Sequence, residues 1–227
     1  MTFQFNITWV LIAINVVVFF ITQSNHEMLY RMTFIINRVK KAKEYDRLFL
    51  SGFAHAGLMH LVFNMLTLYF FGPFVESVVG PTWFLIVFLA SIIGGNLYCL
   101  VMKNQNSEYA ALGASGGVLG IIYAAILLLP NIGLSLFMLP ISIPGWLFGI
   151  LFSLISIALT QLKRGAEARI SHEGHLGGAL MGSLIIMLRL GTLEYDSEQL
   201  YFLIGGVLPL VLFLVVKWIS PKTLYRF

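Results

Sequence analysis

The chain has 227 residues, of which 59% are hydrophobic and 11% are charged. A soluble domain carries about 25% charged residues, so this composition excludes an ordinary soluble protein and predicts an integral membrane protein. The net charge of +4 comes from Lys and Arg in short segments between apolar runs. That pattern indicates membrane topology and argues against nucleic acid as a partner. The single cysteine, Cys99, lies in an apolar run, where we expect it to pack and not to form a disulfide.

Seven apolar runs are candidates for membrane-spanning helices, because about 20 helical residues cross a hydrocarbon core of about 30 Å. The expected spans are residues 7–22, 55–76, 81–102, 113–129, 145–161, 172–189 and 200–219. The first run has no basic segment before it and no small-residue cleavage pattern after it, so we expect a spanning helix and not a signal peptide. The fold class is therefore an all-α polytopic membrane bundle, with residues 1–227 forming one domain.

The uncommon polar residues of these helices collect at one membrane face. If the helices alternate across the membrane, the second, fourth and sixth all enter from the same side. The parts of these helices nearest that side carry the side chains that we call the polar layer: His55, His60, Asn64, Ser115 and His175. Polar groups within spanning helices are costly and mark function or an interhelical contact. We expect the polar layer within about 10–15 Å of one surface, at 1.5 Å per helical residue.

Ser115 stands in the sequence Gly-Ala-Ser-Gly-Gly, and two interpretations are open. As a small residue among glycines it would let two helices cross closely. As a nucleophile at a helix N-terminus it would lie beside unused backbone N–H groups and the positive end of the helix dipole, which are the materials of an oxyanion site. Gly113 and Gly116 would then let a substrate backbone come close.

His175 is open to the same two kinds of interpretation. Alone, it could be a core histidine that bonds to a neighbouring helix. As a base with a near-neutral pKa, it could remove the proton of an alcohol within hydrogen-bond reach. Gly178 and Gly182, at i+3 and i+7 from His175, form a small-residue face that would bring the sixth helix against the fourth. That contact would set the distance from Ser115 to His175.

His60 and Asn64 stand at i and i+4, on one face of the second helix. They could form a polar clamp between helices. Alternatively they could point donors at the oxygen that becomes negative in a tetrahedral intermediate, where one donor contributes about 10²–10³ in rate. We expect His55, which is nearer the surface, to order the first loop or the start of this helix.

Two other protease chemistries fit the sequence poorly. The segment His-Glu-Gly-His at 172–175 lacks the His-Glu-x-x-His spacing of zinc metalloproteases, because position 176 is Leu. We therefore expect no metal and no other cofactor. An aspartyl intramembrane protease needs two Asp within spanning helices, whereas Asp46 and Asp196 lie in predicted loops.

Four segments of the chain resemble the rhomboid family of intramembrane serine proteases. Residues 55–64, His-Ala-Gly-Leu-Met-His-Leu-Val-Phe-Asn, look like the His-x4-His-x3-Asn pattern of its second helix. Residues 113–116 look like its Gly-x-Ser-Gly motif, and residues 174–178 with Gly182 resemble the His and small-residue face of its sixth helix. Arg47 occupies the place of the Arg in its first-loop Trp-Arg pair. The order and spacing agree over about residues 45–185.

The resemblance implies a serine endopeptidase with Ser115 as nucleophile and His175 as general base and then acid. It implies an oxyanion site formed by His60, Asn64 and the Ser115 amide, with no third carboxylate. The implied substrates are single-pass membrane proteins that enter sideways from lipid. Such a substrate helix must unwind near the cut, because a helical backbone uses its carbonyls in hydrogen bonds. The implied location is the cell membrane, as a multi-pass protein, with the bacterial inner membrane expected.

Three departures from the family pattern stand out. Asp46 replaces the Trp of the first-loop pair, so the anchoring of that loop in the lipid interface is open. Leu119 stands where many relatives have a Tyr that packs on the catalytic His, and a Leu side chain cannot stack on the ring. The seventh helix lies beyond a six-helix core and resembles the variants that have one helix added at the C-terminus.

Two questions keep an alternative open: which side of the membrane the polar layer faces, and whether the chain is catalytically active. Lys and Arg gather on the face of the polar layer, which the positive-inside rule places in the cytoplasm; the family usually has that face outside, and we follow the family. The alternative function is a catalytically inactive rhomboid-like protein that binds membrane clients. A channel or transporter with a histidine proton relay is disfavoured, because the sequence shows no inverted repeats with broken helices. The sequence leaves the oligomeric state open.

Overall fold

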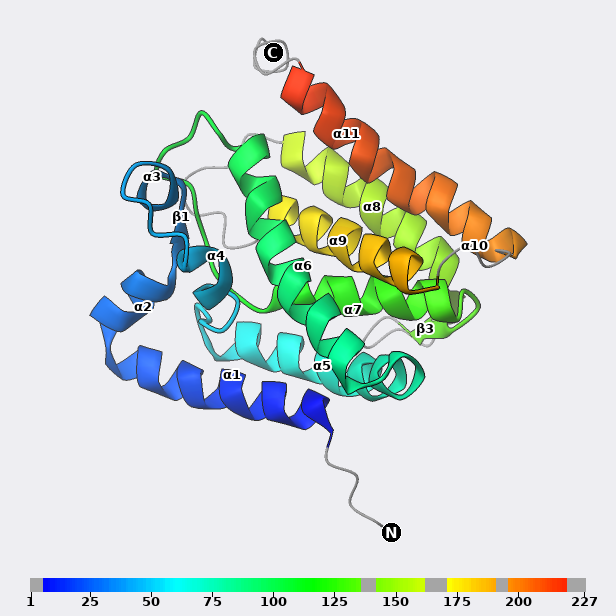
Figure 1. Ribbon diagram of the computed structural model, residues 1–227, viewed down its shortest axis with the longest axis horizontal. Coiled ribbons are helices and arrows are strands. Elements are labelled where there is room, and N and C mark those ends of the chain that lie inside the picture. The colour runs from blue at the N-terminus through cyan, green and yellow to red at the C-terminus, as the bar shows by residue number, and fades with distance from the viewer. Residues whose placement is uncertain (1–5, 136–141, 162–170, 191–195, 220–227) are drawn as a thin grey trace.

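The computed structural model describes residues 6–135, 142–161, 171–190 and 196–219. These residues form a helical bundle (Figure 1). Its helices are α1 (Ile7–Ser24), α2 (His26–Met32), α3 (Ile36–Lys40), α4 (Arg47–Leu50), α5 (Leu58–Val79), α6 (Pro81–Met102), α7 (Ser115–Leu128), α8 (Gly145–Gln161), α9 (His172–Leu190), α10 (Ser197–Phe202), the π-helical segment η1 (Leu203–Val207) and α11 (Leu208–Ile219). Two short antiparallel ribbons pair β1 (Phe34–Ile35) with β2 (Ala110–Ala111) and β3 (Gly133–Ser135) with β4 (Ser142–Pro144).

Among the described residues, four helical stretches are long and apolar enough to cross a membrane: α1, α5, α6 and the stretch from α10 to α11. The helices α7 and α8 are shorter apolar helices. Each of the seven predicted runs is helical over most of its length, which confirms the predicted polytopic helical bundle. The ends of the predicted single domain, residues 1–5 and 220–227, lie outside the described residues.

Two predicted helix starts were wrong by a few residues. α5 begins at Leu58 and not at position 55, and the backbone before it is extended, with φ 178° at Gly57. α7 begins at Ser115 and not at position 113, because Gly113 has φ +124°, in the region that favours glycine. Both corrections place non-helical chain directly before the helix that carries His60 and before Ser115, and His55 itself lies in that non-helical chain.

Three helices, α6, α7 and α9, pack at the centre of the bundle almost backbone to backbone. A Cβ atom on Gly120 of α7 would lie 2.0 Å from the Ser91 Oγ of α6. A Cβ atom on Gly182 of α9 would lie 2.4 Å from the carbonyl oxygen of Gly120. Small residues at these crossings permit the close approach that membrane bundles use in place of hydrophobic side-chain packing.

A buried carboxylate attaches α1 to the end of α5. Glu76 is 7% exposed and accepts from the backbone N–H groups of Ile7 (2.7 Å) and Thr8 (2.9 Å). It also accepts from the Thr8 hydroxyl at 2.8 Å. The first N–H groups of a helix have no partner within the helix, and its N-terminus favours negative charge. Glu76 therefore caps α1 from a neighbouring helix.

The first loop, residues 25–57, is organised around the buried side chain of Arg47, which is 0% exposed. Its guanidinium donates to the carbonyl oxygens of Tyr30 (2.5 Å) and Thr33 (2.6 Å) and to a carboxylate oxygen of Glu44 (2.5 Å). Asp46, which stands at the Trp position of the family pattern, pairs with Arg31 of α2 at 2.6 Å.

The first loop is also joined to the chain that precedes Ser115. The β1–β2 ribbon pairs Phe34 with Ala111, and the Gly113 N–H donates to the Ser51 carbonyl oxygen at 2.8 Å. Asn96 of α6 donates to the Ser51 hydroxyl, also at 2.8 Å. These bonds connect the first loop, α6 and the third loop (residues 103–114) into one layer at this end of the bundle.

The last helical stretch packs across α8 and α6 (Figure 1). Phe202 of α10 is 0% exposed, and its ring lies against Gly149 of α8. The Tyr98 hydroxyl of α6 donates to the Leu210 carbonyl oxygen of α11 at 3.4 Å. The additional helix is thus packed directly on the helices of the six-helix core.

Candidate active site

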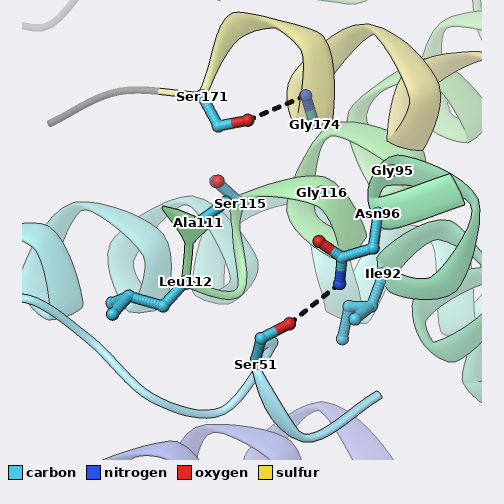
Figure 2. Close-up of a pocket in the computed structure, with 11 residues that line it drawn as sticks. Ser51, Ile92, Gly95, Asn96, Ala111, Leu112, Ser115, Gly116, Ser171 and Gly174 are labelled. Carbon is cyan, nitrogen blue, oxygen red and sulfur yellow. Dashed lines mark hydrogen bonds between the residues drawn. The ribbon is translucent and has the colours of Figure 1, made fainter. Parts of the chain in front are cut away.

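The starts of α5, α7 and α9 meet at one end of the bundle, and the three helices run in the same direction (Figure 1). This arrangement brings the polar layer together at that end. Ser115 is the first residue of α7, and its hydroxyl points toward the first turn of α9 (Figure 2). The first-turn N–H groups of α7 are not used within the helix, so they are available beside the hydroxyl.

His175 lies one turn into α9, and the residues beside it pack on the residue after Ser115 at the α7–α9 crossing. A Cβ atom on Gly116, the residue after Ser115, would lie 3.5 Å from the carbonyl oxygen of Gly174, the residue before His175. A Cβ atom on Gly178 would lie 2.1 Å from the Gly116 carbonyl oxygen. The small-residue face of α9 therefore packs on α7 at the expected place, and residues next to Ser115 and His175 face each other.

His60 lies beside Gly113 of the Gly-x-Ser-Gly segment. A Cβ atom on Gly113 would lie 2.5 Å from the His60 Cε1 atom, so only a glycine leaves room for this ring. Asn64 is 5% exposed, and its amide donates to the His60 carbonyl oxygen of the same helix at 2.9 Å. The structure therefore brings His60 to the residues before Ser115. The hydrogen bond from the Asn64 side-chain amide lies within its own helix.

His55 has a contact that the sequence did not predict. Its Nε2 accepts from the Ala114 N–H at 3.4 Å, and its ring lies 5.1 Å from the ring of His60. Gln23 of α1 donates to the His55 carbonyl oxygen at 3.4 Å. We expected His55 to order the first loop or the start of the second helix. The side chain also bonds to Ala114, the residue directly before Ser115, and the ordering role stays a prediction.

The aromatic neighbour of His175 comes from α8. The Phe152 ring lies 6.4 Å from the His175 ring, with an interplanar angle of 35°. Leu119, where the family pattern has Tyr, is itself buried, at 8% exposure. Sequence reasoning missed Phe152, because an aromatic residue in an apolar run carries no signal of the helix that it faces.

A small cavity lies between Ser115 and α6. It is lined by the residues drawn in Figure 2, which include Ser51, Asn96, Ser115, Ser171 and Gly174. The volume open to the centre of a water molecule is about 20 Å³, enough for roughly one water. Asn96 was missed by the sequence reasoning, although an Asn within an apolar run is itself a signal.

No group of three or more His, Cys, Asp or Glu that could hold a metal ion occurs within residues 6–135, 142–161, 171–190 and 196–219. The Glu173 carboxylate pairs with Lys103 at 2.8 Å, and His172 lies with its ring 6.1 Å from that of His175.

The fold and the site define a polytopic membrane protein with Ser, His and Asn side chains gathered at one end of a helical bundle. The family model for the Rhomboid domain matches residues 42–192. The chain is 33% identical over 160 residues to RHOMBOID-like protein 12, mitochondrial, of Arabidopsis thaliana, covering 63% of this chain and 46% of that protein. It is 30% identical over 181 residues to Rhomboid protease GluP of Bacillus subtilis (strain 168), covering 77% of this chain and 33% of that protein.

A third relative is Rhomboid protein 1, mitochondrial, of Saccharomyces cerevisiae, 26% identical over 182 residues, covering 79% of this chain and 52% of that protein. The matches span between a third and about half of the length of these relatives. The chain belongs to the rhomboid family, and it is a multi-pass membrane protein. Its relatives include both bacterial and mitochondrial proteins.

Proposed function

We propose that the chain is an intramembrane serine endopeptidase that works through a dyad of Ser115 and His175. The observation that carries the proposal is the α7–α9 crossing, where Gly116 faces Gly174 and Gly178. That crossing holds the Ser115-bearing helix start against the turn that carries His175. Family membership supports the same reaction, since one relative bears the name of a protease.

In the proposed mechanism, His175 removes the Ser115 proton while the hydroxyl oxygen attacks the scissile carbonyl carbon. The carbonyl oxygen becomes negative, and the Ser115 N–H and the side chains of His60 and Asn64 donate hydrogen bonds to it. The tetrahedral intermediate collapses when His175 gives its proton to the leaving amine. Water then hydrolyses the acyl-enzyme by the same steps, with His175 again as base.

The His60 ring and the glycine before the nucleophile support this assignment. His60 lies against Gly113, so its donor is beside the first turn of α7. For Asn64 to donate to the substrate oxygen, its amide must exchange its bond to the His60 carbonyl for one to the intermediate. Catalytic hydrogen bonds often form only in the complex with substrate. Asn64 is the member of the site that must move.

The proposed substrates are single-pass membrane proteins, cut where their helices unwind near the membrane surface. An unwound segment exposes the carbonyl carbon that Ser115 attacks, whereas an intact helix hides its carbonyls in hydrogen bonds. We propose the bacterial inner membrane as the location, with the polar layer on the outer side. The enzyme needs no metal or organic cofactor for this reaction.

The test is cleavage of a reporter single-pass protein in proteoliposomes by the wild type, Ser115→Ala and His175→Ala. We expect cleavage only by the wild type. Ser77→Ala is the matched control, because this exposed serine lies at the far end of α5 and donates to the Phe74 carbonyl oxygen of its own helix at 2.7 Å. Cleavage by Ser115→Ala at the wild-type rate would overturn the mechanism. Binding of the reporter without cleavage by the wild type would favour the inactive client-binding alternative.

Orientation is tested by labelling of a cysteine placed at Lys41, an exposed residue of the first loop. The native Cys99 is buried and does not compete for the reagent. We expect a membrane-impermeant maleimide to label this position in intact cells. Labelling only after permeabilisation would show that the positive-inside rule holds for this chain.

A further inference from the structure

Beside the proposed site, four polar side chains form one connected group that we call the Tyr109 cluster. They are Lys103, Tyr109, Ser171 and Glu173. The Tyr109 hydroxyl lies 2.6 Å from the Ser171 Oγ and donates to a Glu173 carboxylate oxygen at 3.3 Å. Lys103 pairs with the other oxygen of Glu173 at 2.8 Å. The proposed mechanism uses none of these groups.

The polar contacts of the cluster share their donors. Tyr109 has a single hydroxyl proton, and both Glu173 and Ser171 lie within hydrogen-bond distance of it. In the 2.6 Å contact either hydroxyl can be the donor. The Ser171 oxygen in turn accepts from the Gly174 N–H at 3.0 Å. The contacts connect the backbone of α9 through Ser171 and Tyr109 to the Glu173 carboxylate.

The two ends of the cluster belong to the two segments that carry the proposed dyad. Tyr109 lies in the third loop, which continues through β2 to Ser115 at the start of α7. Ser171 and Glu173 flank the start of α9, and the His175 N–H donates to the Ser171 carbonyl oxygen at 3.1 Å. The 2.6 Å contact between Tyr109 and Ser171 is thus a direct polar link between the two segments.

The cluster is partly buried: Glu173 is buried, and Lys103, Tyr109 and Ser171 are half-buried. Glu173 is 5% exposed, and the side chain of its partner Lys103 is 26% exposed. Burial, followed by the neighbouring Cys99 and Glu173, raises the pKa of Tyr109 well above its usual value, so the phenol keeps its proton. A buried ion pair adds little net stability because desolvation offsets the attraction. A fully bonded buried network does fix geometry, which favours a positioning role here.

We infer that the Tyr109 cluster sets the position of the first turn of α9 against the third loop, and through it the geometry between Ser115 and His175. Tyr109 and Glu173 are positioning residues in this reaction, since neither one touches the reacting atoms. The inference rests on the proposed protease function.

The experiment measures kcat and KM of reporter cleavage for Tyr109→Phe, Glu173→Gln and the double variant. It also measures the rate at which a fluorophosphonate probe labels Ser115, because that reaction needs the dyad but not the bound substrate. We expect each single variant to lower kcat and the labelling rate about 10-fold or more at unchanged KM, since a misplacement of about 1 Å can cost about 10²-fold. The double variant should have a kcat and a labelling rate no lower than those of the slower single variant, because both substitutions disrupt the same connected set of hydrogen bonds.

Matched controls are Tyr45→Phe and Glu108→Gln, which change the same groups at exposed positions. Both should keep the wild-type kcat. If the cluster variants label and cleave at wild-type rates per folded molecule, as judged by thermal unfolding, the cluster is merely structural and the inference is wrong. If the wild type is neither labelled by the probe nor cleaves the reporter, the proposed function and the inference are both wrong. If the wild type is active and only the cluster variants fail to show the expected loss, the inference alone is wrong.

Discussion

The carbonyl oxygen of Gly116 in α7 lies 2.1 Å from the point where a Cβ atom on Gly178 of α9 would stand. Real Cβ atoms do not approach a backbone oxygen so closely, so Gly178→Ala must push the two helices apart. We expect kcat to fall about 10²-fold, the cost of a misplacement of about 1 Å. Reporter cleavage and fluorophosphonate labelling measure this loss.

Gly57→Ala is the control for that substitution. Nothing lies within 4 Å of a Cβ atom at Gly57, and its φ of 178° is open to any residue. We expect cleavage at the wild-type rate. Full activity of Gly178→Ala would show that the α7–α9 crossing does not set the site.

His60→Ala and Asn64→Ala test the oxyanion site. Each removes a donor that acts on charge developed only in the intermediate, so we expect kcat to fall about 10²–10³-fold with little change in KM. Thr67→Ala is the control, since Thr67 bonds to the Phe63 carbonyl oxygen of the same helix at 2.7 Å, as Asn64 does to that of His60. A change confined to KM would assign His60 and Asn64 to substrate binding.

Phe152→Leu tests the ring that packs beside His175. An aromatic pair contributes about 0.5–1.5 kcal/mol beyond its buried area, so the loss of ring orientation should lower kcat about 2- to 10-fold. The same substitution at Phe70, which is 63% exposed on α5, should have no effect. If Phe152→Leu matches the wild type in reporter cleavage, the orientation of His175 depends on other contacts.

The bundle itself could be predicted from the sequence, because each span is an apolar run of sufficient length. The first residues of its helices could not be predicted, because hydropathy does not determine backbone dihedral angles such as the φ of +124° at Gly113 or the extended backbone at Gly57. The prediction that the polar layer lies at one membrane depth required only that the helices alternate across the membrane. His60 and Ser115 could therefore be assigned to the same layer without knowledge of their contacts.

Contacts between side chains of segments far apart in the chain could not be predicted from the sequence. The bond from Ala114 to His55 depends on how the third loop folds over the start of α5. Tyr109 and Glu173 are 64 residues apart and meet only because α6 and α9 pack together. Tertiary contacts of this kind leave no periodic pattern in the chain.

The ion pairs of the first loop predict a pH dependence of stability. Hydrogen bonds from Arg38 and then Arg47 lower the pKa of Glu44 from its usual 4.5 to about 2. A lowered pKa in the folded state means that the stabilisation is complete above about pH 4.5 and is lost as the pH falls toward 2. Wild-type thermal unfolding in detergent should shift to lower temperature across that window.

Glu44→Gln should unfold at a lower temperature than the wild type at pH 7. Its unfolding temperature should not show the part of the decline between about pH 4.5 and pH 2 that protonation of Glu44 causes. Glu27→Gln, at an exposed position on α2, is the control and should follow the wild-type profile. Parallel profiles of Glu44→Gln and the wild type between pH 5 and pH 2 would show that the pairs around Glu44 do not contribute to stability.

Glu76→Gln separates stability from catalysis, because Glu76 caps α1 at the end of the bundle opposite Ser115. The substitution replaces a charged acceptor of the Ile7 and Thr8 N–H groups by a neutral one. Hydrogen bonds to charged groups contribute about 1.5–3 kcal/mol, so we expect the free energy of unfolding in SDS titrations to fall by roughly that amount. The cleavage rate per folded molecule should stay unchanged, as should both quantities in the neighbouring control Ser77→Ala. A large loss of kcat in folded Glu76→Gln would mean that the docking of α1 is coupled to the active site across the membrane.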